Sequence, residues 1–239
     1  MQLFISDLHL CASRPETTAA FKRFMAGPAR AASTLWILGD LFEYWAGDDD
    51  LEASFNAEIA AEIAALVKHG TAVKIVVGNR DFLLASGFAA QTGASIEAEP
   101  VKLELYGRAT LLVHGDALCT DDTDYQQFRN MVRNPAWQAQ FLTQPLAARR
   151  QIAEQLRLKS EMNKGEKAAA IMDVNPDAVR NLLESEQATC LIHGHTHLPA
   201  RHDLEANGSL CERWVLSDWH ASATWLEASK NGLHTRTES

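Results

Sequence analysis

The sequence predicts an α/β fold built on buried strands, for three reasons. Five short apolar runs of strand length each end in a polar cluster that contains Gly, Asp, Asn or His. The runs are continuously apolar, which is typical of strands that are buried on both faces. A helical pattern separates two of them, as in a βαβ unit. The five runs are residues 3–9, 35–42, 73–81, 110–116 and 189–197.

The first run, LFISDLH, is interrupted by Asp7 within a few residues, so we expect a strand there and not a signal peptide. The runs LWILGDLF and VKIVVGNRD flank a predicted helix over residues 55–69, and Gly70 is placed to end it. The last two runs are TLLVHGD and TCLIHGHTH. The helix is predicted from apolar residues at helical spacing: Phe55, Ile59, Ile63, Leu66 and Val67.

The segment between the last two runs lacks strand signals and predicts helices, with breaks at Pro135 and Pro145. Residues 125–167 contain eight Lys and Arg against three acidic residues, a net charge of +5 in a chain of net charge −9. Such a charge run is most often a solvated helix face. We expect a single domain over residues 1–239 with a helical cap inserted at approximately 120–170.

The composition limits the possible functions. The chain has 239 residues, of which 46% are hydrophobic and 22% charged, as in ordinary soluble proteins. Its net charge argues against a protein that coats nucleic acid by general electrostatics. The four cysteines form no CxxC pair, so a zinc knot or a disulfide framework is not expected, and this fits a reducing cytosol. No window approaches the roughly 20 apolar residues of a membrane span.

Polar residues with metal-binding side chains follow all five runs. In a sheet of this class the carboxyl ends of the strands meet at one edge, where ligands bind. Mixed carboxylate, amide and imidazole ligands favour Mn, Fe or Zn over Ca or Mg. Seven candidates exceed what one ion needs and suit two ions that share a bridging carboxylate. The seven are Asp7, His9, Asp40, Asn79, His114, His195 and His197.

Each of these residues, taken alone, has a simpler explanation. An isolated Asp or His after a strand is usually a turn former or a helix cap. However, Asp7 and His9 are two positions apart, as are His195 and His197, so each pair faces one side of an extended strand end. The coincidence at five strand ends favours a metal site. His193 is expected to support its strand instead.

Five motifs between residues 5 and 199 occur in an order that resembles the calcineurin-like metallophosphoesterases. They are DxH (7–9), GD (39–40), GNxD (78–81), HGD (114–116) and GHTH (194–197). The resemblance implies a metallophosphoesterase β-sandwich flanked by helices, in the layer order αββα. It also implies that Asp40 bridges two ions and that a water shared by both attacks phosphorus. One ion would be held by Asp7, His9, Asp40 and His197, and the other by Asp40, Asn79, His114 and His195.

Arg80 departs from the wider family, which usually has histidine after Gly-Asn. With residues 159–167, 169–176 and 213–220, it makes the chain similar to the UDP-2,3-diacylglucosamine hydrolases, the pyrophosphatases of lipid A biosynthesis. Ser217 is a small deviation, because glycine is expected there. The resemblance implies hydrolysis of UDP-2,3-diacylglucosamine at the α-phosphorus by two Mn²⁺ ions per chain. The products would be UMP and 2,3-diacylglucosamine 1-phosphate (lipid X).

The same resemblance implies two overlapping groups of site residues. The catalytic group is Asp40, Arg80, His114 and His195. The substrate-binding group is Asn79, Arg80, Asp122, Ser160, Asn163, Lys164, Lys167 and His195. Arg157 is a further candidate for substrate contact.

The chemistry of a diphosphate explains a permanent cation at Arg80. The leaving group is a phosphate monoester with a second pKa of about 6, so it departs at neutral pH without receiving a proton. Charge on the non-bridging oxygens must still be neutralised, and a guanidinium does this in fixed geometry. The simpler alternative is that Arg80 pairs with Asp81.

A basic and apolar cap suits a diacylated diphosphate at an anionic membrane. We therefore expect a cytoplasmic protein on the inner face of the inner membrane, bound peripherally, with no nucleic acid and no obligate protein partner. Two other hypotheses remain. One is a metallophosphoesterase that acts on a nucleotide or phosphodiester, and the other is a binding scaffold without catalysis. The scaffold usually lacks ligands, whereas all seven are present here.

Overall fold

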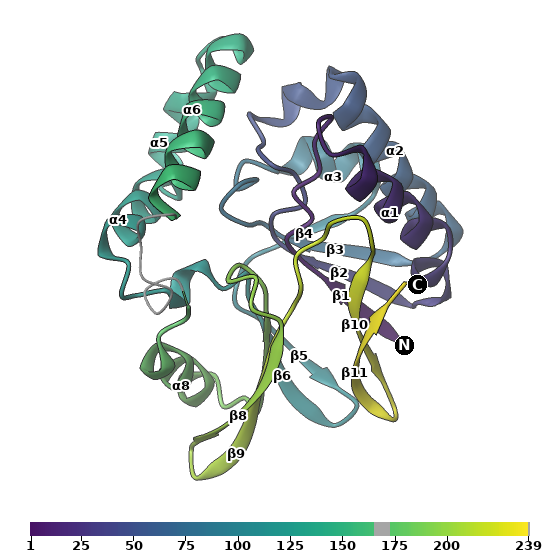
Figure 1. Cartoon of the computed structure of the whole chain (residues 1–239), viewed down its shortest axis with the longest axis vertical. Coiled ribbons are helices and arrows are strands. Elements are labelled where there is room, and N and C mark those ends of the chain that lie inside the picture. The colour runs from purple at the N-terminus through teal and green to yellow at the C-terminus, as the bar shows by residue number, and fades with distance from the viewer. Residues whose placement is uncertain (165–172, 239) are drawn as a thin grey trace.

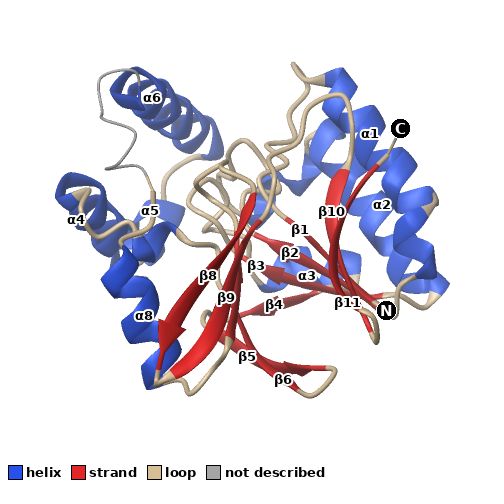
Figure 2. Cartoon of the chain, turned by 60° about the horizontal axis from the view of Figure 1, so that its bottom comes forward, coloured by secondary structure: helices blue, strands red, loops and turns tan. Residues whose placement is uncertain are grey.

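The computed structural model describes residues 1–164 and 173–238, apart from the side chains of residues 159–164. Two mixed β-sheets occupy the centre of the protein, and helices lie on both sides of them (Figure 1, Figure 2). This is the layer order αββα, so the predicted sandwich is confirmed.

The first sheet has six strands in the order β11-β10-β1-β2-β3-β4. Strands β1 to β4 run parallel, and β10 and β11 add an antiparallel hairpin beside β1. The strands are β1 (Gln2–Ile5), β2 (Thr34–Leu38), β3 (Ala72–Val76), β4 (Ser95–Glu97), β10 (Thr224–Ser229) and β11 (Gly232–Thr237).

The second sheet has five strands in the order β5-β6-β7-β9-β8. Its centre, β6-β7-β9, is parallel, and β5 and β8 pair antiparallel at the two edges. The strands are β5 (Val101–Leu105), β6 (Arg108–Leu112), β7 (Cys190–His193), β8 (Ala200–Ala206) and β9 (Ser209–Val215).

All five apolar runs of the sequence form strands, namely β1, β2, β3, β6 and β7, which confirms the prediction. They are divided between the two sheets, and both faces of each sheet are covered. In β1, Leu3 and Ile5 pack in the core beneath the outer helices, whereas Phe4 packs between the sheets. Burial on both faces explains why these runs are continuously apolar.

Three helices cover the outer face of the first sheet: α1 (Pro15–Ala26), α2 (Ser54–His69) and α3 (Ser86–Thr92). Helix α2 is the predicted helix, and its buried face includes Ile59 and Ile63. Gly70 ends it with a φ of 115°, a left-handed conformation that glycine adopts without a steric cost. Helix α8 (Pro176–Ser185) covers the second sheet through Val179 and Leu183.

Short 3-10 helices lie at three of the connections: η1 (Pro28–Ala31), η2 (Asp48–Glu52) and η3 (Asp116–Leu118). Helices α4 (Thr123–Val132), α5 (Pro135–Leu142) and α6 (Leu146–Lys164) follow η3 and rise beside the sandwich (Figure 1). Residues 123–164, called the cap below, are therefore helical as predicted. Pro135 begins α5 and Pro145 precedes α6, as expected for residues that break helices.

The arginines of the cap pair with acidic groups of the sandwich. Arg129 contacts Asp116 and Glu99. Arg149 and Arg150 of α6 pair with Asp49 and Asp50 of η2. Arg133 donates to the carbonyls of Val77 and Gly78 at 3.1 and 3.0 Å, and Arg157 lies 3.8 Å from Glu43. Five of the eight Lys and Arg residues of segment 125–167 therefore hold the cap against the sandwich. The sequence pattern did not reveal their partners.

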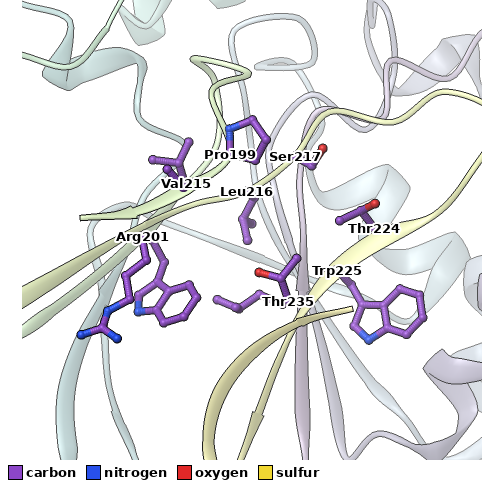
Figure 3. Close-up of a pocket in the computed structure, with 11 residues that line it drawn as sticks. Pro199, Arg201, Val215, Leu216, Ser217, Thr224, Trp225 and Thr235 are labelled. Carbon is purple, nitrogen blue, oxygen red and sulfur yellow. The ribbon is translucent and has the colours of Figure 1, made fainter. Parts of the chain in front are cut away.

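A cavity of about 270 Å³ lies between the edges of the two sheets. Its lining includes Arg201 of β8, Val215 of β9 and Trp225 of β10 (Figure 3). None of the seven predicted metal ligands lines it, so this cavity is separate from the site built below.

Candidate metal centre

The loops that follow β1 and β7 bring the first group of predicted ligands together. Oδ1 of Asp7 lies 3.3 Å from Nε2 of His197, and Nε2 of His9 lies 3.4 Å from the same nitrogen. These three residues offer ligand atoms that all lie within 4.8 Å of one another. Oδ1 of Asp7 is buried and makes no hydrogen bond with a described residue. A cation between these atoms would satisfy it.

A second group is formed by Asp7, Asp40 and His114, again with ligand atoms within 4.8 Å. Nε2 of His114 lies 3.0 Å from Oδ1 of Asn79 and 3.7 Å from Oδ1 of Asp40. The other oxygen of Asp40 lies 3.8 Å from Nε2 of His9. Asp40 therefore stands between the two groups, with one oxygen toward each.

His195 joins the second group through ring contacts. Its ring centroid lies 5.0 Å from that of His114 and 5.8 Å from that of Tyr125 in α4. Its backbone N–H donates to Oδ2 of Asp7 at 2.9 Å. All seven predicted ligands thus converge at the ends of five strands, and their buried Asp and His side chains suit a transition-metal site.

Five of the seven ligands have a left-handed backbone conformation, with φ between 49° and 69°. This conformation costs of order 1–3 kcal/mol at a residue other than glycine and occurs preferentially at functional sites. The five are Asp7, His9, Asp40, His195 and His197.

Glycines beside the ligands allow the strand ends to approach closely. A Cβ atom at Gly78 would overlap the side chain and backbone of Asp40. A Cβ atom at Gly194 would overlap Ser6 and Asp7. The glycines of the GN and GH motifs are therefore needed because no side chain fits between neighbouring loops.

Asp81 organises the loops and does not pair with Arg80. Its buried carboxylate accepts from the backbone N–H groups of Gly78 at 2.7 Å, Leu41 at 2.8 Å and Asp40 at 3.3 Å. Burial, with a contribution from the charge of Asp40, raises the pKa of Asp81 to about 6. The alternative of an Arg80–Asp81 ion pair is wrong, because that carboxylate is occupied by backbone groups.

Arg80 is placed against the centre by its own backbone. Its N–H donates to Oδ1 of Asp40 at 2.8 Å, and its carbonyl accepts from the N–H of Trp45 at 3.0 Å. Among the residues that the structure describes, its guanidinium forms no ion pair within 4 Å, but its charge acts on Asp40 and opposes the rise in the pKa of that carboxyl. A half-buried guanidinium beside the ligands is therefore available to an anion.

The carboxylates give the centre a strong negative field. Burial would raise the pKa of Asp7, but the imidazole of His197 and its neighbours hold it well below its usual range. Burial and the charge of Asp7 raise the pKa of Asp40. Burial would lower the pKa of His114, but nearby carboxylates, Asp40 above all, raise it to about 9. Sites of this kind attract cations strongly.

Two further contacts orient the ligand histidines. Nδ1 of His114 lies 2.8 Å from the carbonyl oxygen of Leu38, and Nδ1 of His197 lies 3.5 Å from Oδ2 of Asp218. Ser217, before Asp218, has no left-handed φ and its hydroxyl donates to the carbonyl of Asp218 at 3.0 Å. The turn therefore accepts serine without backbone strain. His193 is fully buried and lies 2.8 Å from the carbonyl oxygen of Gly194, which agrees with its expected supporting role.

The predicted substrate contacts on the cap are only partly described. Asp122 is the N-cap of α4 and accepts from the N–H of Tyr125 at 3.2 Å. The side chains of Ser160, Asn163 and Lys164 and the whole of Lys167 lie outside the described residues.

Two residues near the centre were missed by sequence reasoning. Asp116 is fully buried and accepts from the hydroxyl of Tyr125 at 2.7 Å and from Nε of Arg129 at 2.8 Å. Glu43 lies 3.5 Å from Nδ1 of His9. The HGD motif could have drawn attention to Asp116, whereas Glu43 stands in an apolar loop with no comparable signal.

Removing the metal should lower the thermal stability of the protein. At a free Mn²⁺ concentration of 100 times Kd, binding adds about 2.7 kcal/mol to the free energy of unfolding. Thermal unfolding of chelator-treated protein, with and without added Mn²⁺, measures the shift. His114→Ala should lose most of it, whereas His69→Ala, at the exposed end of α2, should keep it. Equal shifts in these two variants would place the metal elsewhere.

Comparisons with known proteins agree with this geometry. A UDP-2,3-diacylglucosamine hydrolase of Aromatoleum aromaticum is 53% identical over 224 residues, which cover 94% of this chain and 91% of that protein. The hydrolase of Cellvibrio japonicus is 51% identical, over 98% of this chain and 97% of that protein. The hydrolase of Escherichia coli is 48% identical, over 97% of this chain and 96% of that protein.

The fold has a structural counterpart as well. A solved archaeal phosphodiesterase superposes with a TM-score of 0.50 over 99% of both chains at 12% identity, which shows a shared fold alone. The model of a family described as calcineurin-like phosphoesterase matches residues 2–199. This range contains all seven candidate ligands and every parallel strand of the two sheets except β9. The chain therefore belongs to the calcineurin-like phosphoesterase family.

Proposed function

We propose that this protein hydrolyses the diphosphate of UDP-2,3-diacylglucosamine at the α-phosphorus. The products are UMP and 2,3-diacylglucosamine 1-phosphate (lipid X), an intermediate of lipid A biosynthesis. The observation that carries the proposal is the complete set of candidate ligands in a chain that is about half identical, over nearly its whole length, to UDP-2,3-diacylglucosamine hydrolases.

Two Mn²⁺ ions are the proposed cofactors. Both groups of ligand atoms contain only oxygen and imidazole nitrogen, which suits Mn²⁺. When bound, the ions supply positive charge to the phosphate oxygens and lower the pKa of a water that they share. The proposed ligands of one ion are Asp7, His9, Asp40 and His197, and those of the other are Asp40, Asn79, His114 and His195.

The chain's own residues hold the ions and the diphosphate in place. Asp40, with one oxygen toward each ligand group, fixes the spacing between them. His114 is held by the carbonyl of Leu38, so its Nε2 points into the centre. Arg80 binds non-bridging phosphate oxygens, because its guanidinium stays charged and offers a planar pair of donors.

The cap is the proposed binding site for the rest of the substrate. Both Asp122 and His195 contact Tyr125 at the start of α4, Asp122 through the backbone N–H and His195 through the ring. We place Ser160, Asn163, Lys164 and Lys167, at and beyond the end of α6, toward the glucosamine and the phosphates. Met131, Leu142 and Leu158 are 42–47% exposed on the cap and offer apolar surface to the acyl chains.

Peripheral contact with the cytoplasmic face of an anionic membrane completes the proposal. Within the described parts of the chain, no helix is both long and apolar enough to cross a bilayer. Since five cap arginines already have partners, we expect apolar contact to contribute more to membrane binding than the charge of the cap. High salt should therefore weaken vesicle binding only modestly.

Shortening the acyl chains should weaken substrate capture while leaving the metal requirement unchanged. Each buried CH2 group is worth about 0.8 kcal/mol, so even a partly enclosed chain contributes more than most polar contacts. Values of kcat/KM for a series of acyl lengths, each with a Mn²⁺ titration, measure both effects. Equal cleavage of deacylated UDP-glucosamine would contradict the role of the cap in lipid binding.

A substrate panel tests the proposal against other phosphoesterase activities. UDP-2,3-diacylglucosamine, other UDP-sugars, nucleotides and DNA are each incubated with the protein and Mn²⁺. Preference for the diacylated substrate is expected, whereas preference for a nucleotide or a phosphodiester would replace the proposed function. An absence of turnover in all reactions would favour a binding scaffold.

A further inference from the structure

Glu43 is a buried carboxylate next to the metal centre, and no role has been assigned to it above. It is 6% exposed and lies in the loop that follows β2. A short backbone ladder fixes its place: the N–H of His9 donates to Asp40, that of Leu10 to Leu41, and that of Glu43 to Leu10. The ladder holds the 40–43 loop alongside the 8–10 loop, so Glu43 is kept beside His9.

The two oxygens of Glu43 face different partners. Oε2 lies 3.5 Å from Nδ1 of His9 and 3.9 Å from the guanidinium of Arg14. Oε1 lies 3.8 Å from the guanidinium of Arg157, which belongs to α6 in the cap. Carboxylates this deeply buried are usually paired with cationic groups, as this one is. One side chain therefore touches both a metal ligand and the cap.

The orientation of the His9 ring connects the contact with Glu43 to metal binding. Nε2 faces the centre, 3.4 Å from Nε2 of His197 and 3.8 Å from Oδ2 of Asp40. If Nε2 binds a metal, the proton of the neutral ring is on Nδ1, which faces Glu43. At 3.5 Å the pair is within ion-pair distance, and a hydrogen bond formed on a small approach would fix the tautomer and the ring orientation and strengthen the nitrogen as a ligand. His114 uses a backbone carbonyl for the same purpose, and that group cannot connect it to the cap.

We propose that Glu43 is a positioning residue for His9 and that it couples metal binding to the position of cap helix α6 through Arg157. The inference rests on the metal centre of the proposed function and is independent of the substrate. Because coupling is reciprocal, bound metal should steady α6, and a docked α6 should favour metal binding.

The first test is Mn²⁺ affinity without substrate. Glu43→Gln keeps the size of the side chain and removes its charge. Titration of the chelator-treated protein, followed by the electron paramagnetic resonance of free Mn²⁺, should show roughly 10–100-fold weaker binding. Glu43→Asp, which keeps the charge but retracts the carboxylate, should lose less. Arg180→Gln is the matched control, since it removes an exposed ion pair with Asp177 within α8 that touches neither a ligand nor α6, and it should bind Mn²⁺ like the wild type.

The second test is hydrogen exchange of the cap. In the wild type, added Mn²⁺ should slow amide exchange in residues 146–158, and Arg157→Gln should remove this effect while Arg180→Gln keeps it.

Mn²⁺ affinities of Glu43→Gln and Glu43→Asp within twofold of the wild type would overturn the positioning role. Unchanged exchange in the wild type would overturn the coupling, and this measurement decides even where a Glu43 variant fails to fold. Loss of activity toward the proposed substrate would affect neither result, because both are measured on the protein and Mn²⁺ alone.

Discussion

Asp40→Ala is expected to lose more activity than a variant that lacks any other single ligand, with kcat/KM reduced by more than about 10³-fold, the upper end for removal of one transition-state contact. The reason is its position: one oxygen lies 3.7 Å from Nε2 of His114 and the other lies 3.8 Å from Nε2 of His9. Its loss should affect both ligand groups, whereas the loss of Asn79 should affect one.

The matched experiment compares Asp40→Ala with Asn79→Ala over a range of Mn²⁺ concentrations. Added Mn²⁺ should restore part of the activity of Asn79→Ala and none of that of Asp40→Ala. Metal content per chain, measured on the same samples, should fall further in Asp40→Ala. Recovery of Asp40→Ala in excess Mn²⁺ would show that this carboxylate does not join the two groups.

Arg80→Ala is expected to raise the activation barrier by about 3 to 4 kcal/mol, as for the loss of a group that stabilises charge in a transition state. Within the described chain its guanidinium forms no ion pair, and its backbone N–H donates to Asp40. The side chain can therefore be removed while the loop stays in place. Arg80→Lys should recover only part of the rate, because an ammonium lacks the planar pair of donors.

Steady-state kinetics and metal content, both measured on the same samples, distinguish a role of Arg80 in phosphate chemistry from a structural role. Arg80→Ala should keep the metal content of the wild type and lose kcat. Turnover close to that of the wild type would leave Arg80 without a role in phosphate chemistry.

The sequence predicted the features of this protein that are local along the chain. A strand and its polar end are encoded by neighbouring residues, so the runs that became β1, β2, β3, β6 and β7 could be recognised individually. The seven candidate ligands could be recognised for the same reason, because each of them follows one of these strands. Gly70 also predicted the end of α2, because only a left-handed residue fits there.

Features that depend on distant contacts could not be predicted from the pattern. Nothing in the apolar runs shows which strands pair, so the division into two sheets came from the family resemblance and not from the residues. Asp81 is adjacent to Arg80 in sequence, yet its partners are backbone groups of residues 40, 41 and 78. Side-chain types carry no information about such partners.

The partners of the charged residues in the cap could not be predicted from the sequence either. A count of lysines and arginines predicted a basic surface, but Arg149 reaches Asp49, and Arg129 reaches Asp116 across the boundary between the cap and the sandwich. A net charge over a segment says nothing about which charges already have partners in the folded protein. Glu43 was missed in the same way, because its role depends on two residues, His9 and Arg157, that are distant in sequence.

The central claim is that water attacks the α-phosphorus of UDP-2,3-diacylglucosamine at this centre. The protein is incubated with Mn²⁺ and this substrate in water labelled with heavy oxygen, and both products are analysed by mass spectrometry. The account predicts UMP that carries one labelled oxygen and lipid X that carries none. No UMP, or a label in the sugar 1-phosphate, would contradict it.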